Sequence, residues 1–328
     1  MIALKRYDVN QLPNEDKFIQ SFNDLINCPE KIEKFMGILG NQLCLLKKYF
    51  IFRAKKDSYE LGDSKKETED EGNAFDFPSE VNKDEYKDHL IAVQSFLHVS
   101  TEPHHWLIPA FDYLKEKQEK PEKINVKCFI EKLEEIDNNL LKKGEGRRIN
   151  GLPSMDRMAY NDRPNHYWFY RLDYELWKLS RDEPEGDVWK KFKDEAKKEK
   201  AVLNLLGEFR FRKCGSIEHI KPQNPQESTA DELVNEFGNL ALISSSRNSK
   251  FSNNPTAGKK QIIIDSKYTE SLKMLHFLYS DQNIQEQTKF MYEILEKAVN
   301  GTSPQDAEQC TNKLVSEPTN DSSEKLNS

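Results

Sequence analysis

Two short stretches, IEHIKPQNP at residues 217–225 and FGNLALISSSRNSKFSN at residues 237–253, decide the fold of the second half of this chain. The segment SIEHI, residues 216–220, is short and apolar around a charged pair and ends before a proline, as a strand does. GNLALIS, residues 238–244, is a second strand candidate. The serines that follow it can cap a short helix over residues 246–254. The predicted order is therefore strand, long loop, strand, helix.

Four polar residues in these stretches are candidates for chemistry: Glu218, His219, Asn239 and Asn248. An imidazole at the end of a strand, with an ordinary pKa of about 6.5, can take a proton from water near neutral pH. Carboxylate and amide oxygens suit a hard cation such as Mg²⁺, which would stabilise the charge developing on a scissile phosphate. Asn248 follows Asn239 by nine residues, far enough for a helix side chain to turn back toward the histidine. The pattern favours metal-assisted hydrolysis of a phosphate ester.

Most of the remaining chain shows apolar residues every three or four positions, which is typical of amphipathic helices. The ranges predicted to be helical are 16–53, 84–99, 104–118, 123–143, 166–179, 187–206, 266–280 and 284–299. One segment differs, because FRFRK at 209–213 alternates with period two and predicts a further strand. The aromatic residues of 166–179 recur at helical spacing, so we expect them in the core and not stacked on bases. The predicted fold class is mainly α (α+β).

Composition divides the chain further. Residues 55–88 hold twelve acidic and six basic side chains with few apolar ones, which is typical of a solvated linker or insertion. The last part of the chain is rich in small polar residues and is expected to be disordered. The predicted parts are a helical region at 1–54, an acidic linker or insertion at 55–88, a helical connecting region at 89–204, a strand-containing domain with C-terminal helices at 205–299, and a tail at 300–328.

The net charge of −7, from 49 Lys and Arg against 56 Asp and Glu, is as a total unlike that of a nucleic-acid binder. However, the acidity belongs to the insertion and the tail. Residues 209–267 carry nine basic and six acidic side chains. This mildly basic segment is compatible with a phosphate-bearing substrate but is too weakly charged to predict one by itself.

Cysteine usage and hydropathy limit the class of protein. The five cysteines are scattered and form no CxxC pair, so neither a disulfide framework nor a cysteine–zinc cluster is expected. Reduced thiols are typical of a cytoplasmic protein. No run approaches the roughly 18 apolar residues that a membrane span needs, which excludes an integral membrane protein.

The two motif stretches resemble the HNH, or His-Me finger, nucleases, whose ββα-metal core carries a carboxylate–His pair, an Asn in an N-L pair and a final His or Asn nine residues later. More narrowly, they are similar to the C-terminal nuclease domain of GmrSD-type modification-dependent restriction systems, through E-H-I-x-P-Q, G-N-L, N-S-K and S-N. The resemblance implies a ββα-metal nuclease module at roughly 205–262, completed by C-terminal helices. It covers about 60 residues tightly.

The resemblance also implies a role for each residue. His219 would be the general base, and Asn239 would brace the loop and orient the histidine. Asn248 and Glu218 would hold the metal, Mg²⁺ or Mn²⁺. The expected phosphate contacts are Arg247, Lys250 and Lys259. The expected reaction is hydrolysis of a DNA phosphodiester in the restriction of foreign or modified DNA.

The chain departs from the family in one respect. Related full-length proteins carry a nucleotide-dependent sensor domain with a D-G-Q-Q-R-like motif, and this sequence has none. We therefore expect any nucleotide dependence to come from a separate sensor subunit. Two alternatives remain open: a non-catalytic helical adaptor that keeps a dead nuclease core and binds nucleic acid or the sensor, and an RNA-cleaving toxin.

Overall fold

The computed structural model describes residues 28–53, 59–61, 84–100, 105–119, 124–143, 151–183, 186–197, 200–223 and 232–300. The sequence-based predictions for residues 1–27, 62–83 and 301–328 lie outside this part of the chain. Among the described residues, every helix is too short or too polar to cross a lipid bilayer.

The first half of the chain is helical, with one small hairpin. Its elements are α3 (Pro29–Tyr49), β1 (Ile51–Arg53), β2 (Tyr59–Leu61), α4 (Asp84–Ser100), α5 (Leu107–Glu119) and α6 (Val126–Lys143). Strands β1 and β2 pair antiparallel, with Phe52 opposite Glu60. The prediction that 55–88 contains no element is therefore wrong at β2, whereas the helix predicted at 84–99 is confirmed by α4.

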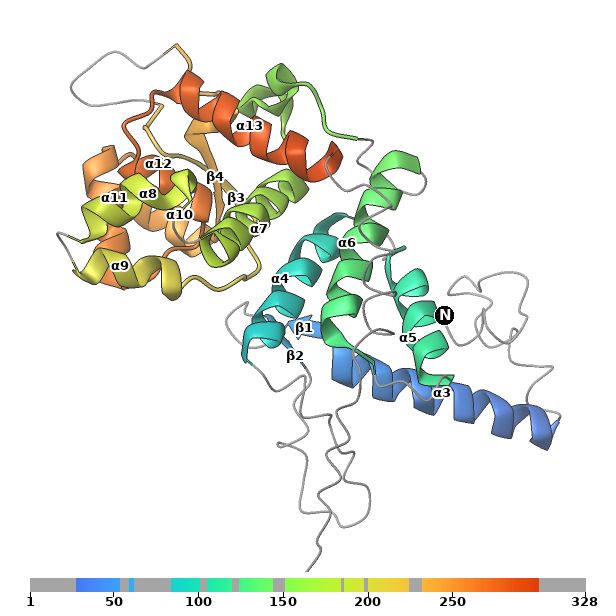
Figure 1. Ribbon diagram of the computed structural model, residues 1–328. Coiled ribbons are helices and arrows are strands. Elements are labelled where there is room, and N and C mark those ends of the chain that lie inside the picture. Colours follow the sequence, from blue (N-terminus) through green and yellow to red (C-terminus); the bar gives the residue numbers. More distant parts are fainter. Residues whose placement is uncertain are drawn as a thin grey trace, which may run out of the picture.

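The second half gathers around a two-stranded sheet (Figure 1). Its elements are the 3-10 turns η5 (Met155–Met158) and η6 (Tyr160–Asp162), α7 (His166–Asp182), α8 (Asp187–Ala196), α9 (Lys200–Gly207), β3 (Ser216–His219), η7 (Phe237–Asn239), β4 (Leu240–Ile243), α10 (Ser245–Phe251), α11 (Thr256–Ser266), α12 (Leu272–Tyr279) and α13 (Ile284–Asn300). The predicted order of strand, loop, strand and short helix is confirmed by β3, β4 and α10.

Two predictions in this half are corrected, and one helix was not predicted. No strand forms at 209–213, where Phe209 and Phe211 are buried and Arg212 forms an isolated bridge. Alternation marks a strand only when consecutive residues have backbone partners, and here it reflects two phenylalanines that face the core. The single helix predicted at 187–206 is two helices, α8 and α9, and α11 was not predicted.

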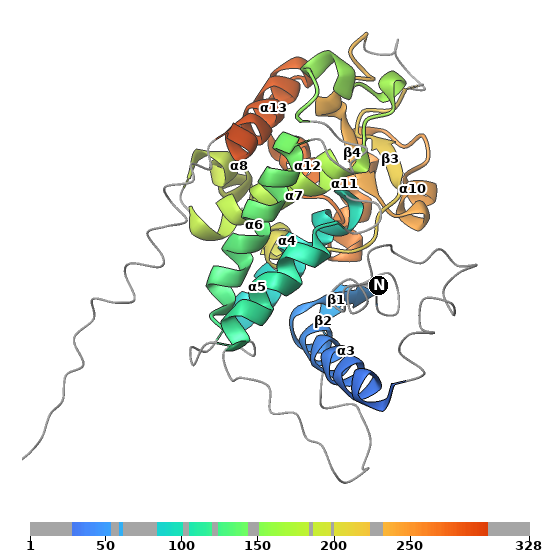
Figure 2. The same ribbon diagram turned by 90° about the vertical axis from the view of Figure 1, so that its right-hand side faces the viewer.

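Helix α7 lies at the centre of the molecule and joins its two halves. It contacts α4 on one side and β4, α12 and α13 on the other, and Figure 2 shows α4, α6 and α7 close together. Its first turn is capped by Asn165, whose Oδ1 accepts a hydrogen bond from the Tyr167 backbone N–H at 3.0 Å. Tyr167, Phe169 and Tyr174 are buried, so the core interpretation of the aromatic run is confirmed.

A buried polar network fixes α7 against α6. The Tyr167 hydroxyl donates to Asp137 Oδ2 at 2.6 Å, and Arg171 Nη1 donates to the same oxygen at 3.0 Å. Glu134 accepts from Tyr174 and from Lys178 Nζ, the latter at 2.8 Å. Because these charges are buried or half-buried and are paired, the first and second halves of the chain are held together by specific contacts as well as by apolar packing.

Helix α3 forms as the periodicity predicts, but its apolar residues are not all buried. Pro29 opens the helix, a position where a missing N–H costs nothing. Ile32, Met36, Leu43 and Leu46 are exposed, Met36 to 56%. The periodicity therefore predicted this helix without identifying which face is buried, and the predicted helical range 16–53 is wrong at its end, where 51–53 forms β1.

A buried histidine makes the stability of this fold depend on pH. His276 of α12 lies between the Val188 carbonyl of α8 and Gln287 of α13, and it stacks on Phe290. Burial lowers the pKa of His276 to about 4. Between pH 6.5 and pH 4 the unfolded chain binds the proton and the folded chain does not, so the free energy of unfolding falls as the pH drops, by about 3 kcal/mol in total.

Urea denaturation at pH 7 and pH 4 tests this prediction. Over this interval the free energy of unfolding of the His276→Gln variant should fall by about 3 kcal/mol less than that of the wild type. An equal loss in both proteins would show that His276 does not contribute to the pH dependence.

Candidate active site

Strands β3 and β4 place the candidate base at the end of a hairpin. They pair antiparallel, with Glu218 opposite Ala241 and His219 opposite Leu240. Strand β4 is completely buried, so its neighbour β3 is held against the core. Successive side chains of a strand point to opposite faces, and therefore Glu218 and His219 have different neighbours.

His219 is held by a residue that the sequence did not point out. Its Nε2 lies 3.0 Å from Asn235 Oδ1, which also accepts a hydrogen bond from Gln223 Nε2 at 3.0 Å. Because that oxygen can only accept, His219 Nε2 carries the proton, and the lone pair of a neutral imidazole is on Nδ1. The Tyr160 ring packs edge-on against the imidazole, with 4.5 Å between ring centroids.

The electrostatics favour a neutral imidazole. Burial lowers the pKa of His219, and the Lys259 ammonium nearby lowers it further, while the hydrogen bond with Asn235 opposes both effects. An imidazole that is neutral near pH 7 with an unprotonated Nδ1 has the protonation state that a general base needs.

Asn239 braces the loop around the histidine. Its Oδ1 accepts from the Lys221 N–H at 2.7 Å, and its Nδ2 donates to the carbonyls of Lys221 and Val234 at 3.0 and 2.7 Å. Its backbone carbonyl accepts from the Ile220 N–H at 2.8 Å. These bonds close the chain on either side of the hairpin. The side chain that is hydrogen-bonded to the imidazole is Asn235, whereas the sequence-based prediction gave the orienting task to Asn239.

The turn that carries Asn239 is itself fixed by two buried residues. Lys273 of α12 donates from Nζ to the carbonyls of Phe237, Gly238 and Leu240. A Cβ on Gly238 would lie 2.5 Å from the Ile284 carbonyl oxygen and from the Thr288 nitrogen. Helix α13 therefore lies so close to the turn that only glycine fits at this position. The turn is thus built between α12 and α13.

Glu218 forms a buried ion pair with Lys259 of α11. Lys259 Nζ lies 2.5 Å from Glu218 Oε1 and 2.5 Å from the His219 carbonyl oxygen, and the lysine is 1% exposed. Burial raises the pKa of the Glu218 carboxyl, and the ammonium opposes that rise. Lys259 therefore ties α11 to the end of β3 and balances the buried carboxylate.

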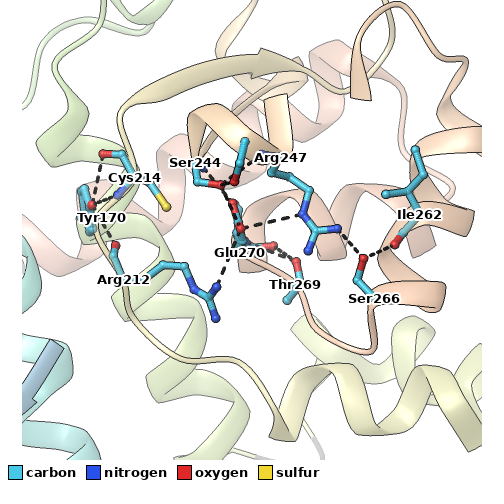
Figure 3. Close-up of polar contacts among 11 residues, drawn as sticks. Tyr170, Arg212, Cys214, Ser244, Arg247, Ile262, Ser266, Thr269 and Glu270 are labelled. Carbon is cyan, nitrogen blue, oxygen red and sulfur yellow. Dashed lines mark hydrogen bonds and ion pairs between the residues drawn. The ribbon is translucent and has the colours of Figure 1, made fainter. Parts of the chain in front are cut away.

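Helix α10, which carries Asn248, is anchored through Glu270 (Figure 3). Ser244 caps the helix by accepting from the Arg247 N–H at 3.2 Å, and its own N–H donates to Glu270 Oε2 at 2.8 Å. The Arg247 guanidinium donates to Ser266 at 2.7 Å and lies 3.8 Å from Glu270. Asn248 is half-buried on this fixed helix.

The three expected phosphate contacts lie in different environments. Lys250 is exposed near the end of α10. Arg247 is 3% exposed and lies over the Tyr268 ring, and Lys259 is buried against Glu218. A phosphate on Arg247 or Lys259 would have to displace these partners, whereas Lys250 needs no rearrangement.

The donor set suits a divalent cation that keeps most of its water. Glu218 has one carboxylate oxygen, Oε1, on Lys259 Nζ, and the half-buried Asn248 offers an amide oxygen. Within the described residues no three His, Cys, Asp or Glu side chains gather as a metal site. Mg²⁺ prefers oxygen donors and commonly takes only one or two of them from protein. The side-chain types of Glu218 and Asn248 therefore suit this ion.

Sequence reasoning missed Asn235 and Tyr160. Asn235 lies in the sequence between the two motif stretches, and Tyr160 comes from η6, far from both. Neither position shows a periodicity or spacing that would have pointed to the histidine. Both are brought to it by the backbone bond from the Tyr160 N–H to the Asn235 carbonyl, at 2.8 Å.

Comparison with known proteins agrees with the resemblance in the motif stretches. Residues 152–294 match the model of the family described as the C-terminal domain of GmrSD restriction endonucleases. This segment includes η5, η6 and α7 as well as the β3–β4 hairpin. No curated protein and no solved structure was found to match the chain.

Proposed function

From the similarity of residues 152–294 to a restriction endonuclease domain, we propose that this protein is a metal-dependent DNA endonuclease of the HNH type. It would act in the restriction of foreign or modified DNA. Its β3–β4–α10 segment would be the ββα-metal module. The observation that carries the proposal is the hydrogen bond between His219 Nε2 and Asn235 Oδ1, which leaves the lone pair of a neutral imidazole on Nδ1.

The residues divide the reaction between them. His219 Nδ1 accepts a proton from water as the water oxygen bonds to phosphorus, and the bond from phosphorus to the leaving deoxyribose oxygen breaks. Asn235 keeps the imidazole in the required tautomer, and Asn239 keeps the loop closed around it. The leaving oxygen is protonated by solvent.

The metal would be held by Asn248 and the second carboxylate oxygen of Glu218. A bound Mg²⁺ or Mn²⁺ supplies charge stabilisation to the phosphate and to the leaving oxygen. Lys250 keeps its proposed role as a phosphate contact. We reassign Arg247 and Lys259 to positioning: the first anchors α10, and the second holds Glu218.

A separate sensor subunit completes the proposal, by analogy with the GmrSD restriction endonucleases whose C-terminal domain residues 152–294 match. In this arrangement the present chain would cut, and its partner would read a nucleotide and control when cutting occurs. The product of the neighbouring gene is the natural first candidate for such a partner.

The test is cleavage of supercoiled plasmid by the purified protein, on unmodified and modified DNA, with and without that partner. We expect nicked and linear products with Mg²⁺ or Mn²⁺ and none after EDTA, since the proposed donors leave most metal positions to water and exchange readily. Restoring the metal after EDTA should restore cleavage.

One observation favours a second candidate, a non-catalytic adaptor with an inactive nuclease core. The Glu218–Lys259 pair satisfies a proposed metal ligand without any metal. DNA binding without cleavage in every metal and partner condition would support the adaptor and contradict the nuclease. Cleavage of RNA but not DNA would instead favour the toxin.

A further inference from the structure

An open pocket lies beside the candidate base. Its volume is about 570 Å³, within the range of roughly 300–1,000 Å³ that is common for ligand sites. The lining residues are Tyr160, Asn161, Arg163, Pro164, His166 and Ile217. Ile217 precedes His219 by two positions on β3, so their side chains share one face of the sheet, and the Tyr160 ring touches the imidazole.

The lining chemistry suits an anion. No carboxylate lies among the lining residues, and Arg163 brings an exposed guanidinium. His166 is the first residue of α7, a helix of 17 residues, so the positive end of the helix dipole is at this wall of the pocket. Burial lowers the pKa of His166, which leaves Arg163 as the one full positive charge among the lining residues at neutral pH.

The backbone at Arg163 is unusual. Its φ is +52° and its ψ is 64°, in the left-handed region that arginine rarely adopts, and a proline follows. Glycine or asparagine would fit this position with less strain. Its N–H donates to the Tyr160 carbonyl at 3.0 Å, which closes η6. An unfavourable residue at a sharp turn on a pocket rim is the kind of feature found at binding sites.

We propose that this pocket is a substrate subsite, in which Arg163 binds a DNA backbone phosphate next to the scissile one. The proposal rests on the nuclease function proposed above. A strand bound at Arg163 and passing Tyr160 would run directly to His219. The subsite would hold the strand in place while His219 acts on the adjacent phosphate.

Equilibrium binding of a fluorescent short DNA duplex, measured by anisotropy in EDTA over a series of salt concentrations, tests the subsite. EDTA prevents cleavage, so binding is measured separately from the reaction. We expect Arg163→Gln to weaken binding about tenfold at low salt and to reduce the slope of log K against log salt by about 0.9, the loss of one phosphate contact. Arg163→Lys should retain most of the slope.

Two further variants serve as controls. Arg210→Gln removes another exposed arginine, one that donates to the backbone carbonyls of Gly207 and Phe209, and should bind as the wild type does. Arg163→Gly relieves the backbone and should lose binding with a melting temperature no lower than that of the wild type.

The results separate this inference from the nuclease proposal. If Arg163→Gln binds with the wild-type affinity and slope while the wild type cleaves plasmid, the subsite is wrong and the nuclease stands. If the Arg163-dependent slope appears but no metal supports cleavage, the phosphate site stands and the nuclease proposal fails. A wild type that binds no DNA overturns both.

Discussion

The His219→Ala variant is expected to lose metal-dependent plasmid cleavage by a factor of about 10²–10⁴, the usual contribution of a general base. The loss follows from the hydrogen-bonding state of the imidazole, whose Nε2 donates to Asn235 and whose Nδ1 is the remaining proton acceptor. Initial rates of nicking of supercoiled plasmid in Mg²⁺ measure it. Far-ultraviolet circular dichroism should show an unchanged helix content.

The matched variant is Asn235→Ala, which keeps the imidazole but removes its orienting acceptor. We expect a cleavage rate between those of the wild type and of His219→Ala, because the ring can then adopt the other tautomer or rotate. A His219→Ala protein that cuts as fast as the wild type would rule out this residue as the base. Equal rates for Asn235→Ala and the wild type would show that the contact at 3.0 Å does not matter to the reaction.

Replacing Lys259 with methionine is expected to lower the free energy of unfolding by about 3 kcal/mol at pH 7, because the change leaves the Glu218 carboxylate buried without its partner. Methionine has a similar length and cannot donate to the His219 carbonyl either, so that acceptor is also left without its ammonium donor. Urea denaturation followed by tryptophan fluorescence measures the change.

The double variant Lys259→Met/Glu218→Gln distinguishes the charge from the packing. Removing the unpaired charge should recover a large part of the lost stability, and the loss in the single variant should shrink at low pH, where Glu218 is protonated. A single variant as stable as the wild type would mean that the pair contributes nothing. The same loss in both variants would point to packing alone.

The positions of individual elements follow closely from local patterns. The strand that ends at His219, the second strand and the capped helix with Asn248 were all predicted, because apolar runs, turn residues and a serine cap each act within a few residues. The strand predicted from the alternation at 209–213 did not form, for a related reason. A local pattern reports which side chains face the core, and a segment with only an isolated bridge shows the same pattern as a strand.

The amino-acid sequence by itself determined that the chain is mainly helical and that a short strand ends in a Glu–His pair. It also determined that a second strand and a short helix carrying Asn248 follow. Only the tertiary structure decided which side chains meet there. The partner of His219 lies 16 residues away and that of Glu218 lies 41 residues away. The pocket wall with Arg163 comes from a turn before α7. Such contacts depend on how separate elements pack, and periodicity along one element does not contain that information.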